Sequence, residues 1–80
     1  MFEENITAIS EVIGNRIIEL CSERDLSINK LAKLSNVAVS TIDNIVNGRC
    51  SNPRIFTIKK ICEGFGMSVI EFFDFEGLKK

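Results

Sequence analysis

Three thiols are the most reactive side chains of this 80-residue sequence: Cys21, Cys50 and Cys62. They share no CxxC spacing, and the sequence contains no histidine, so a zinc site or a Cys–His nucleophile would lack its usual partner. Cys21 and Cys62 fall within helical patterns, where a free thiol behaves as a small hydrophobic group. We therefore expect reduced structural cysteines, no metal, no cofactor and no enzymatic activity.

The charged residues are distributed unevenly along the chain. Ten Lys and Arg and 11 Asp and Glu give a net charge of −1. Residues 27–60 carry six Lys and Arg against one Asp, a local charge of +5, whereas residues 1–26 carry −4 and residues 61–80 carry −2. Charge acts over a Debye length of about 8–10 Å, so the central segment can attract a polyanion although the net charge is negative. An ordinary solvated surface remains the alternative.

Length and hydropathy limit the class of protein. Eighty residues fit a single domain, 1–80, and 45% hydrophobic residues are enough to form a core. No apolar run approaches the ~18–20 residues of a membrane span, and the N-terminus does not resemble a signal peptide. We expect a cytoplasmic protein without membrane contact or a small-molecule effector domain, with a short extension at 1–6 and a tail at 75–80.

Apolar residues recur every three or four positions, which predicts helices. The first and longest helix has an inward face made of Ile6, Ile9, Ile13, Ile17 and Leu20. Asn5 or Thr7 is expected to cap its start, and Gly14 within it indicates a close contact with another element.

Two short helices follow. The first is expected to start at the N-cap Ser27 and to end at Leu34, and its inward residues are Ile28, Leu31 and Leu34. The next runs from about Val39 to Val46 with Ile42 and Ile45 facing inward. Asn47-Gly48 stops it, because glycine is the usual residue just past a helix end.

The C-terminal third predicts two more helices. Asn52 and Pro53 fit an N-cap followed by proline at the first helical position. The apolar face of this fourth helix consists of Ile55, Ile58, Ile61, Cys62 and Phe65, and it is expected to close at Gly64 and Gly66. Ser68 and Glu71 have capping-box spacing and start a fifth helix that carries Phe72 and Phe73. The expected fold class is therefore an all-α, compact five-helix domain.

The segment from about Ser27 to Gly48 has the residues that a helix-turn-helix requires. Ala32 is small where the second helix must approach the third, and Asn36 tolerates the positive φ of a tight interhelical turn. Ile42 and Ile45 anchor the third helix in the core. Together, at these offsets, they predict two short helices packed at a steep angle, the motif that places its second helix in the major groove of DNA.

The sequence resembles the phage-repressor-like (XRE-type, lambda-repressor-like) family of helix-turn-helix transcriptional regulators. The matching residues are Leu26-Ser27-Ile28-Asn29-Lys30-Leu31-Ala32, Ser40-Thr41-Ile42, Asn47-Gly48, Pro53 and Ile58-Lys59-Lys60-Ile61-Cys62. Gly14-Asn15-Arg16-Ile17 resembles the family's first helix and Met67 to Phe73 its last, so the resemblance covers roughly Ile13 to Phe73 without gaps. The resemblance implies a sequence-specific regulator of transcription that acts as a repressor on a double-stranded DNA operator.

The resemblance also implies which residues meet DNA. The base-facing positions are Ala38, Val39, Ser40 and Asn44, at the start of the helix that enters the major groove. The expected phosphate contacts, several of them at helix N-termini, are Ser27, Ile28, Thr41, Asn47, Arg49 and Arg54. Val39 suits a thymine methyl group and Asn44 suits adenine, so we expect an A·T-leaning half-site. The structural alternative for Val39 is a partly buried residue at the helix start.

Several positions depart from the family pattern. Ile28 replaces a common Gln, which leaves only its backbone N–H for a phosphate. Ala38 replaces a usual Ser or Thr cap, at a cost of about 1 kcal/mol. Cys21 and Val46 stand where the family often has a partly buried Arg–Glu pair. Exchanging both partners for apolar residues can be neutral or stabilising, so we expect Cys21 and Val46 to be buried and in contact.

Proteins with this motif usually bind as two-fold dimers on half-sites about 34 Å apart. Phe72, Phe73 and Phe75 are candidate homodimer contacts, with Phe2 as a possible addition, and the alternative is that they only complete the core. A second functional hypothesis is a protein-interaction module on the same scaffold, such as an antitoxin or accessory factor, because Ile28, Ala38 and Val39 make the DNA-facing surface more apolar than usual. The basic central segment favours DNA.

Overall fold

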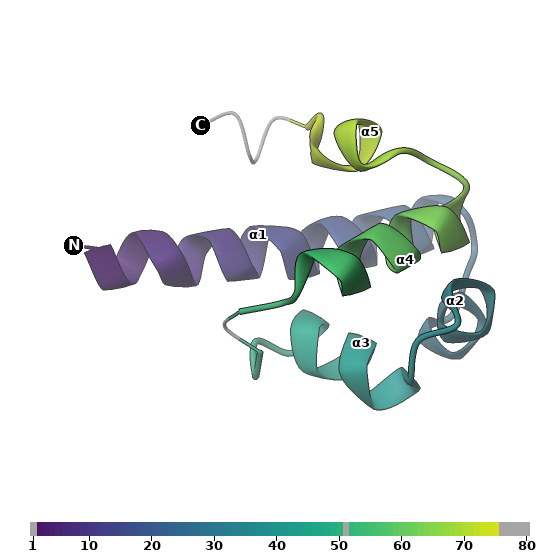
Figure 1. The fold of residues 1–80 in the computed structure, drawn as a ribbon, viewed down its shortest axis with the longest axis horizontal. Coiled ribbons are helices and arrows are strands. Elements are labelled where there is room, and N and C mark those ends of the chain that lie inside the picture. The colour runs from purple at the N-terminus through teal and green to yellow at the C-terminus, as the bar shows by residue number, and fades with distance from the viewer. Residues whose placement is uncertain (1, 51, 76–80) are drawn as a thin grey trace.

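The computed structural model is a bundle of helices around one core (Figure 1). The helices are α1 Phe2–Glu23, α2 Ile28–Ser35, α3 Val39–Val46, α4 Ile55–Phe65 and α5 Val69–Phe73. The structure describes the backbone of residues 2–50 and 52–75 and the side chains of residues 10–50 and 52–75; no strand occurs within these ranges. The predicted all-α, five-helix fold is confirmed.

Every helix contributes a buried side chain to the core. Ile17 of α1, Leu31 of α2, Ile42 of α3 and Ile61 of α4 have no exposed surface, and Phe72 of α5 is 1% exposed. These residues lie on the apolar faces that the spacing predicts. Ile6 and Ile9, which the same spacing assigns to the first helix, lie outside the described side chains.

Local signals fix several helix ends as predicted. The Ser27 hydroxyl accepts a hydrogen bond from the Lys30 N–H at 3.0 Å and caps α2. Asn36 ends α2 in the left-handed conformation, with φ 56°. The Ser68 hydroxyl accepts from the Glu71 N–H at 3.1 Å, and the Glu71 carboxylate accepts from the Ser68 N–H at 2.9 Å. The turn between α2 and α3 and the start of α5 are therefore set by their own residues.

Other ends differ from the prediction. Helix α1 begins at Phe2, so Asn5 and Thr7 lie inside it rather than at its cap, and their side chains are outside the described set. The N-cap of α4 is Arg54, with φ −74° and ψ 142°, rather than Asn52. Pro53 therefore lies in the loop before the helix. Its fixed φ is compatible with this position, since it fits an extended loop as well as a first helical turn.

Helix α2 includes Ser35, and Gly64 lies within α4 rather than at its end. The left-handed residue that closes α4 is Gly66, with φ 74°. Two assigned inward residues are also solvent-facing: Leu34 is 50% exposed and Ile55 is 67% exposed. Leu34 lies next to the last residue of α2 and Ile55 is the first residue of α4. At a helix end, a shift of the boundary by one residue changes whether a side chain faces the core or solvent.

Two glycines allow helix backbones to approach closely. A Cβ on Gly14 would lie 2.8 Å from the Ile45 carbonyl oxygen and 3.2 Å from the Val46 Cα, so α1 packs directly on α3. A Cβ on Gly64 would lie 3.1 Å from the Ser35 Cα, where α4 meets α2. The close contact predicted for Gly14 is confirmed.

The expectation for Cys21 and Val46 is met only in part. Cys21 is 6% exposed and belongs to the core, whereas Val46 packs against the core but is half-buried. The Val46 backbone faces Gly14, which precedes Cys21 by two helical turns of α1. A direct contact between the two side chains stays a prediction.

Arg16 of α1 and Arg24, in the turn just after α1, hold the C-terminal helices. The Arg16 guanidinium donates from Nε to the Phe72 carbonyl at 2.8 Å and from Nη2 to the Glu71 carbonyl at 3.2 Å. Arg24 donates from Nη1 to the Phe65 carbonyl at 2.8 Å. Both therefore satisfy carbonyls at helix C-termini, which have no partner inside their own helix.

Among the described residues, no helix is long and apolar enough to cross a membrane.

Candidate nucleic-acid interface

The outer face of α3 presents the residues that the sequence assigns to base contacts. Ala38, Ser40 and Asn44 are exposed, and Val39 is 43% exposed. The opposite face is anchored by Ile42 and Ile45, which are 0% and 2% exposed. An exposure of 43% leaves Val39 partly buried as well as accessible, so its assignment to base contacts and the structural alternative both stay open. The helix is fixed from behind and open in front.

The first turn of α3 has an unusual cap. The N-cap Ala38 offers only its backbone, and its carbonyl accepts from the N–H groups of Thr41 at 3.0 Å and Ile42 at 3.3 Å. The first N–H groups of any helix have no intrahelical acceptor, so those of Val39 and Ser40 point outward beside exposed side chains. The expected weak cap is confirmed.

The N-terminus of α2 combines a capped and an open part. Ser27 is exposed, and its hydroxyl oxygen accepts the capping bond from Lys30 while its O–H can still donate outward. Ile28 is half-buried and packs against the core. Its backbone N–H belongs to the first helical turn, as expected for a residue that could meet a phosphate only through the backbone.

The loop after α3 is held by one carbonyl. The Asn44 carbonyl accepts from the N–H groups of Arg49 at 2.9 Å and Cys50 at 3.1 Å, and Gly48 adopts φ 75°. Asn47, Arg49 and Arg54 are exposed at this end of α3. The chain reversal thus carries two guanidinium groups past the end of α3.

A hollow of about 310 Å³ lies between α3, the following loop and the start of α4. Its walls bring together Thr41, which is half-buried, and Arg54, both expected to contact phosphates. The lining residues are Thr41, Ile45, Cys50, Asn52, Pro53, Arg54 and Thr57. Sequence reasoning missed Cys50 and Thr57 at this surface. The apolar pattern of α4 assigns Thr57 no role, and only the approach of α4 to α3 brings it here.

Comparison with known proteins identifies the family of the chain that carries this surface. Residues 16–77 match the family described as the Cro/C1-type HTH DNA-binding domain. The chain belongs to that family. This is a family of DNA-binding domains rather than of enzymes, and the resemblance drawn from the sequence is confirmed.

Curated relatives of this Cro/C1-type domain come from Bacillus subtilis (strain 168). The HTH-type transcriptional repressor RghR is 40% identical over 53 residues, which cover 66% of this chain and 39% of the relative. The uncharacterized HTH-type transcriptional regulator RghRB is 40% identical over 48 residues, covering 60% of this chain and 34% of the relative. The Cro/C1-type chain therefore spans less than two-fifths of the length of either relative.

A solved structure shares the fold. The crystal structure of the prophage Lp1 protein 11 superimposes with a TM-score of 0.77 at 35% sequence identity, covering 89% of this chain and 93% of that one. The similarity extends over nearly all of both chains, so the two proteins share the arrangement of helices throughout.

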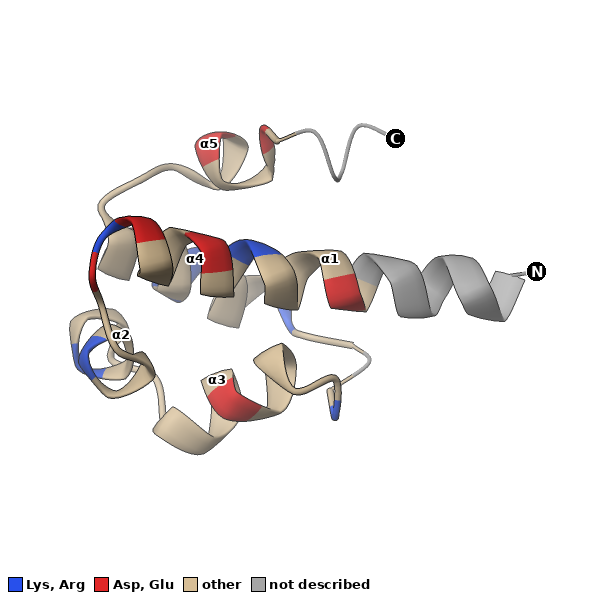
Figure 2. Cartoon of the chain, turned by 180° about the vertical axis from the view of Figure 1, so that it is seen from behind, with Lys and Arg blue, Asp and Glu red and all other residues tan. Residues whose placement is uncertain are grey.

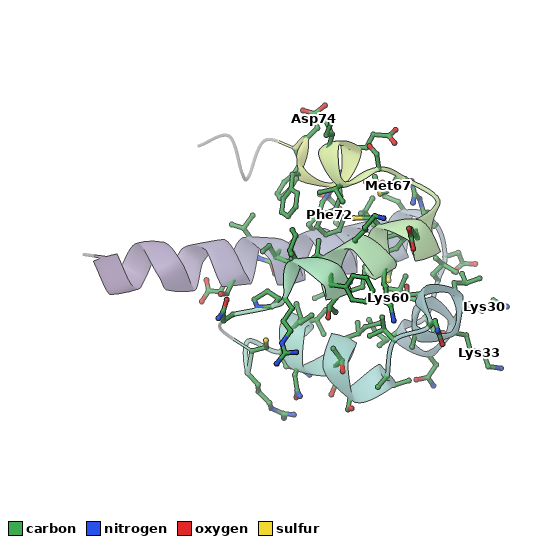
Figure 3. The ribbon with its side chains drawn as sticks, in the orientation of Figure 1. Lys30, Lys33, Lys60, Met67, Phe72 and Asp74 are labelled. Atoms are coloured by element: carbon green, nitrogen blue, oxygen red, sulfur yellow. The ribbon has the colours of Figure 1, made fainter. Side chains whose placement is uncertain are left out.

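In this Cro/C1-type domain the cations of α2 and of the loop after α3 flank α3 instead of lying on it (Figure 2). Lys30 and Lys33 extend outward from α2 on one side (Figure 3), and Arg49 and Arg54 are exposed on the other. The single charged residue of α3 is the acidic Asp43. Four cations of the +5 segment thus form two separate basic surfaces, and α3 with its single acidic residue lies between them.

Two further cations of the segment are engaged elsewhere. Lys59 Nζ lies 3.6 Å from a Glu63 carboxylate oxygen, and Lys60 Nζ lies 5.0 Å from the centroid of the Phe56 ring.

The pKa values of the Cys21 and Cys62 thiols are raised because burial disfavours the thiolate, which agrees with a structural role for both.

Proposed function

We propose that this domain is the DNA-binding part of a sequence-specific transcriptional regulator, a repressor that occupies a double-stranded operator. The observation that carries the proposal is the Cro/C1-type α3, with Ile42 and Ile45 buried behind an exposed Val39, Ser40 and Asn44. A helix anchored in this way can enter the major groove without moving the core. Regulation by operator occupancy is in keeping with the relative RghR, which is named a transcriptional repressor.

In this proposal α3 reads bases and its surroundings hold the backbone. Ala38, Val39, Ser40 and Asn44 face the base edges. The phosphate contacts are Ser27, Ile28, Thr41, Asn47, Arg49 and Arg54. Short side chains on α3 supply few strong hydrogen bonds, so affinity depends largely on the flanking phosphate contacts. Asn44 pairs with adenine, which makes the half-site A·T-leaning at that position.

We further propose that the regulator acts in the cytoplasm as a homodimer on two half-sites about 34 Å apart. Phe72 cannot contribute to the dimer contact because it is 1% exposed in the core. Phe73 and Phe75 are half-buried and remain candidates on α5. A second apolar surface, at the start of α4, consists of Ile55 and Phe56, which are 67% and 65% exposed.

The position of these two surfaces favours α4. In both Figure 1 and Figure 2, α3 and α5 lie on opposite sides of α4. The start of α4 follows the loop after α3 and so lies near the proposed DNA face. A two-fold contact there keeps both recognition helices directed to one side of the dimer, as a palindromic operator requires.

Salt dependence tests DNA binding against the alternative of a protein-interaction module. Duplexes selected from a random library are titrated by fluorescence anisotropy at several salt concentrations. DNA binding predicts a log–log slope of about −0.9 for each phosphate contacted. Arg49→Ala and Arg54→Ala should each reduce the slope by about 1, whereas Lys59→Ala should leave it unchanged because Lys59 is paired with Glu63. Absent or salt-insensitive binding would favour the protein-interaction module.

A further inference from the structure

The start of α3 presents a methyl-bearing surface next to an acid. Val39 is 43% exposed although its own helix already has two buried anchors, and the exposed Ala38 precedes it. Asp43 follows Val39 by four positions, which places the two side chains on the same face about one turn apart. Among the described residues, no hydrogen bond or ion pair engages the Asp43 carboxylate.

Each member of this pair restricts the base that it can face. An exposed valine contacts a C5-methyl group in the major groove favourably. A carboxylate accepts a hydrogen bond from the N4 amino group of cytosine and repels the O4 acceptor of thymine. On a pyrimidine ring, C4 and C5 are bonded neighbours, so one base can meet both side chains only if it carries an amino group and a methyl group side by side.

We infer that Val39 and Asp43 together form a recognition site for 5-methylcytosine in duplex DNA. The inference rests on the proposed function, because it requires α3 in the major groove, and it names the base chemistry that this helix selects. Thymine satisfies Val39 alone and cytosine satisfies Asp43 alone. The A·T preference is then confined to the base pair that faces Asn44, and operator binding becomes sensitive to cytosine methylation.

The size of the effect follows from the area of one methyl group. Burying one methyl or methylene group changes an equilibrium by about fourfold. Replacing cytosine by 5-methylcytosine at the position facing Val39 should therefore tighten binding about fourfold. Replacing 5-methylcytosine by thymine should weaken it, because the carboxylate of Asp43 then meets an acceptor.

The test uses the full chain and two random duplex libraries, one amplified with deoxycytidine triphosphate and one with its 5-methyl derivative. Recovered sequences are synthesised again with cytosine, 5-methylcytosine, thymine or uracil at each selected pyrimidine and titrated by fluorescence anisotropy. We expect a fourfold gain from the cytosine methyl group at one position per half-site. Val39→Ala should abolish that gain, and Asp43→Asn should remove the preference for 5-methylcytosine over thymine at the same position.

Lys59→Ala, at an exposed position paired with Glu63 and outside the proposed DNA contacts, is the control and should retain the methyl gain. Binding that shows no methyl gain at any position, or a gain that persists in Val39→Ala, would overturn the inference while leaving DNA binding intact. The inference would also be overturned if the methyl group of thymine, compared with uracil, tightened binding as much as the methyl group of 5-methylcytosine does compared with cytosine, and if Asp43→Asn left both gains unchanged. If neither library yields salt-sensitive binding, the proposed function itself fails. Circular dichroism of each variant confirms that the domain is folded.

Discussion

Ser35 is a polar residue buried where its hydroxyl finds no hydrogen-bond partner among the described residues. It is 4% exposed at the contact between α2 and α4. Gly64 faces it across the contact, and an added Cβ there would meet the Ser35 side chain and its Cα. A buried hydroxyl without a partner loses its hydration and gains nothing in return.

Ser35→Ala should therefore raise the free energy of unfolding, by about 1 kcal/mol, because it removes the unpaired group and leaves the backbone contact unchanged. Urea unfolding followed by circular dichroism measures the change. Ser27→Ala is the matched control: it removes the hydroxyl that caps α2 and should lower the free energy by about 1 kcal/mol. A destabilised Ser35→Ala would mean that the hydroxyl has a partner in solution.

At the scale of single helices, α5 depends on its capping box more than the longer helices depend on their caps. It has five residues, so the bonds between Ser68 and Glu71 cover much of its length. The pKa of Glu71 is lowered because its carboxylate accepts a hydrogen bond from the Ser68 N–H, with a further contribution from the Ser68 side chain. The charged carboxylate is thus the form that the folded helix favours.

The pH dependence follows from the sign of that shift. A carboxyl group with a lowered folded-state pKa stabilises the fold above its ordinary pKa of about 4.3, and this contribution is lost as the pH falls through the lower, folded value. An NMR titration of the Glu71 side chain should give a midpoint below the ordinary value. Glu71→Gln should unfold with less dependence on pH in the acidic range. A midpoint at or above the ordinary value would contradict the capping bond.

Signals within single helices were also the ones that sequence reasoning could use. The cap at Ser27, the left-handed Asn36 and the capping box at Ser68 depend on residues three or four positions apart, so they are legible in the sequence. Proline fits both a loop and a first helical turn, so Pro53 alone does not locate the start of α4. A helix of five residues gives too short a pattern to tell which of Phe72 and Phe73 points inward.

The candidate site shows the same division. The exposed face of α3 could be assigned because it lies opposite Ile42 and Ile45 on one helix. The hollow that brings Cys50 and Thr57 beside Arg54 could not, because it depends on how the loop folds back toward α4. The separation of the basic segment into two surfaces likewise required the positions of α2 and of the loop after α3.

At the scale of the whole molecule, α1 links the C-terminal helices to the motif. Arg16 bonds two carbonyls at the end of α5, pairs with Glu19 at 2.8 Å and lies 4.8 Å from the centroid of the Phe75 ring. Its side chain is 11% exposed. The one basic residue of α1, Arg16, therefore serves the fold and is directed toward α5 rather than toward the proposed DNA surface on α3.

Arg16→Ala should lower the free energy of unfolding by about 2 kcal/mol, because it leaves carbonyls at the end of α5 without their charged donor. Hydrogen exchange should show α5 amides exchanging faster than those of α2 and α4. Lys59→Ala removes an exposed pair and should change stability by less than about 0.5 kcal/mol. Equal exchange rates in α5 before and after the Arg16 substitution would show that this contact does not hold the helix.

Self-association of the whole molecule depends on which exposed apolar surface forms the dimer contact. Sedimentation equilibrium, with and without a selected duplex, compares Phe56→Ser with Ile70→Ser. Ile70 is the better exposed of the two, at 82%, but it lies on α5, on the other side of α4 from the recognition helix. If the dimer forms at the start of α4, Phe56→Ser should weaken self-association at least tenfold and Ile70→Ser should not. The reverse result would place the contact on α5, beside Phe73 and Phe75, and the two recognition helices would then have to reach one operator from a different two-fold axis.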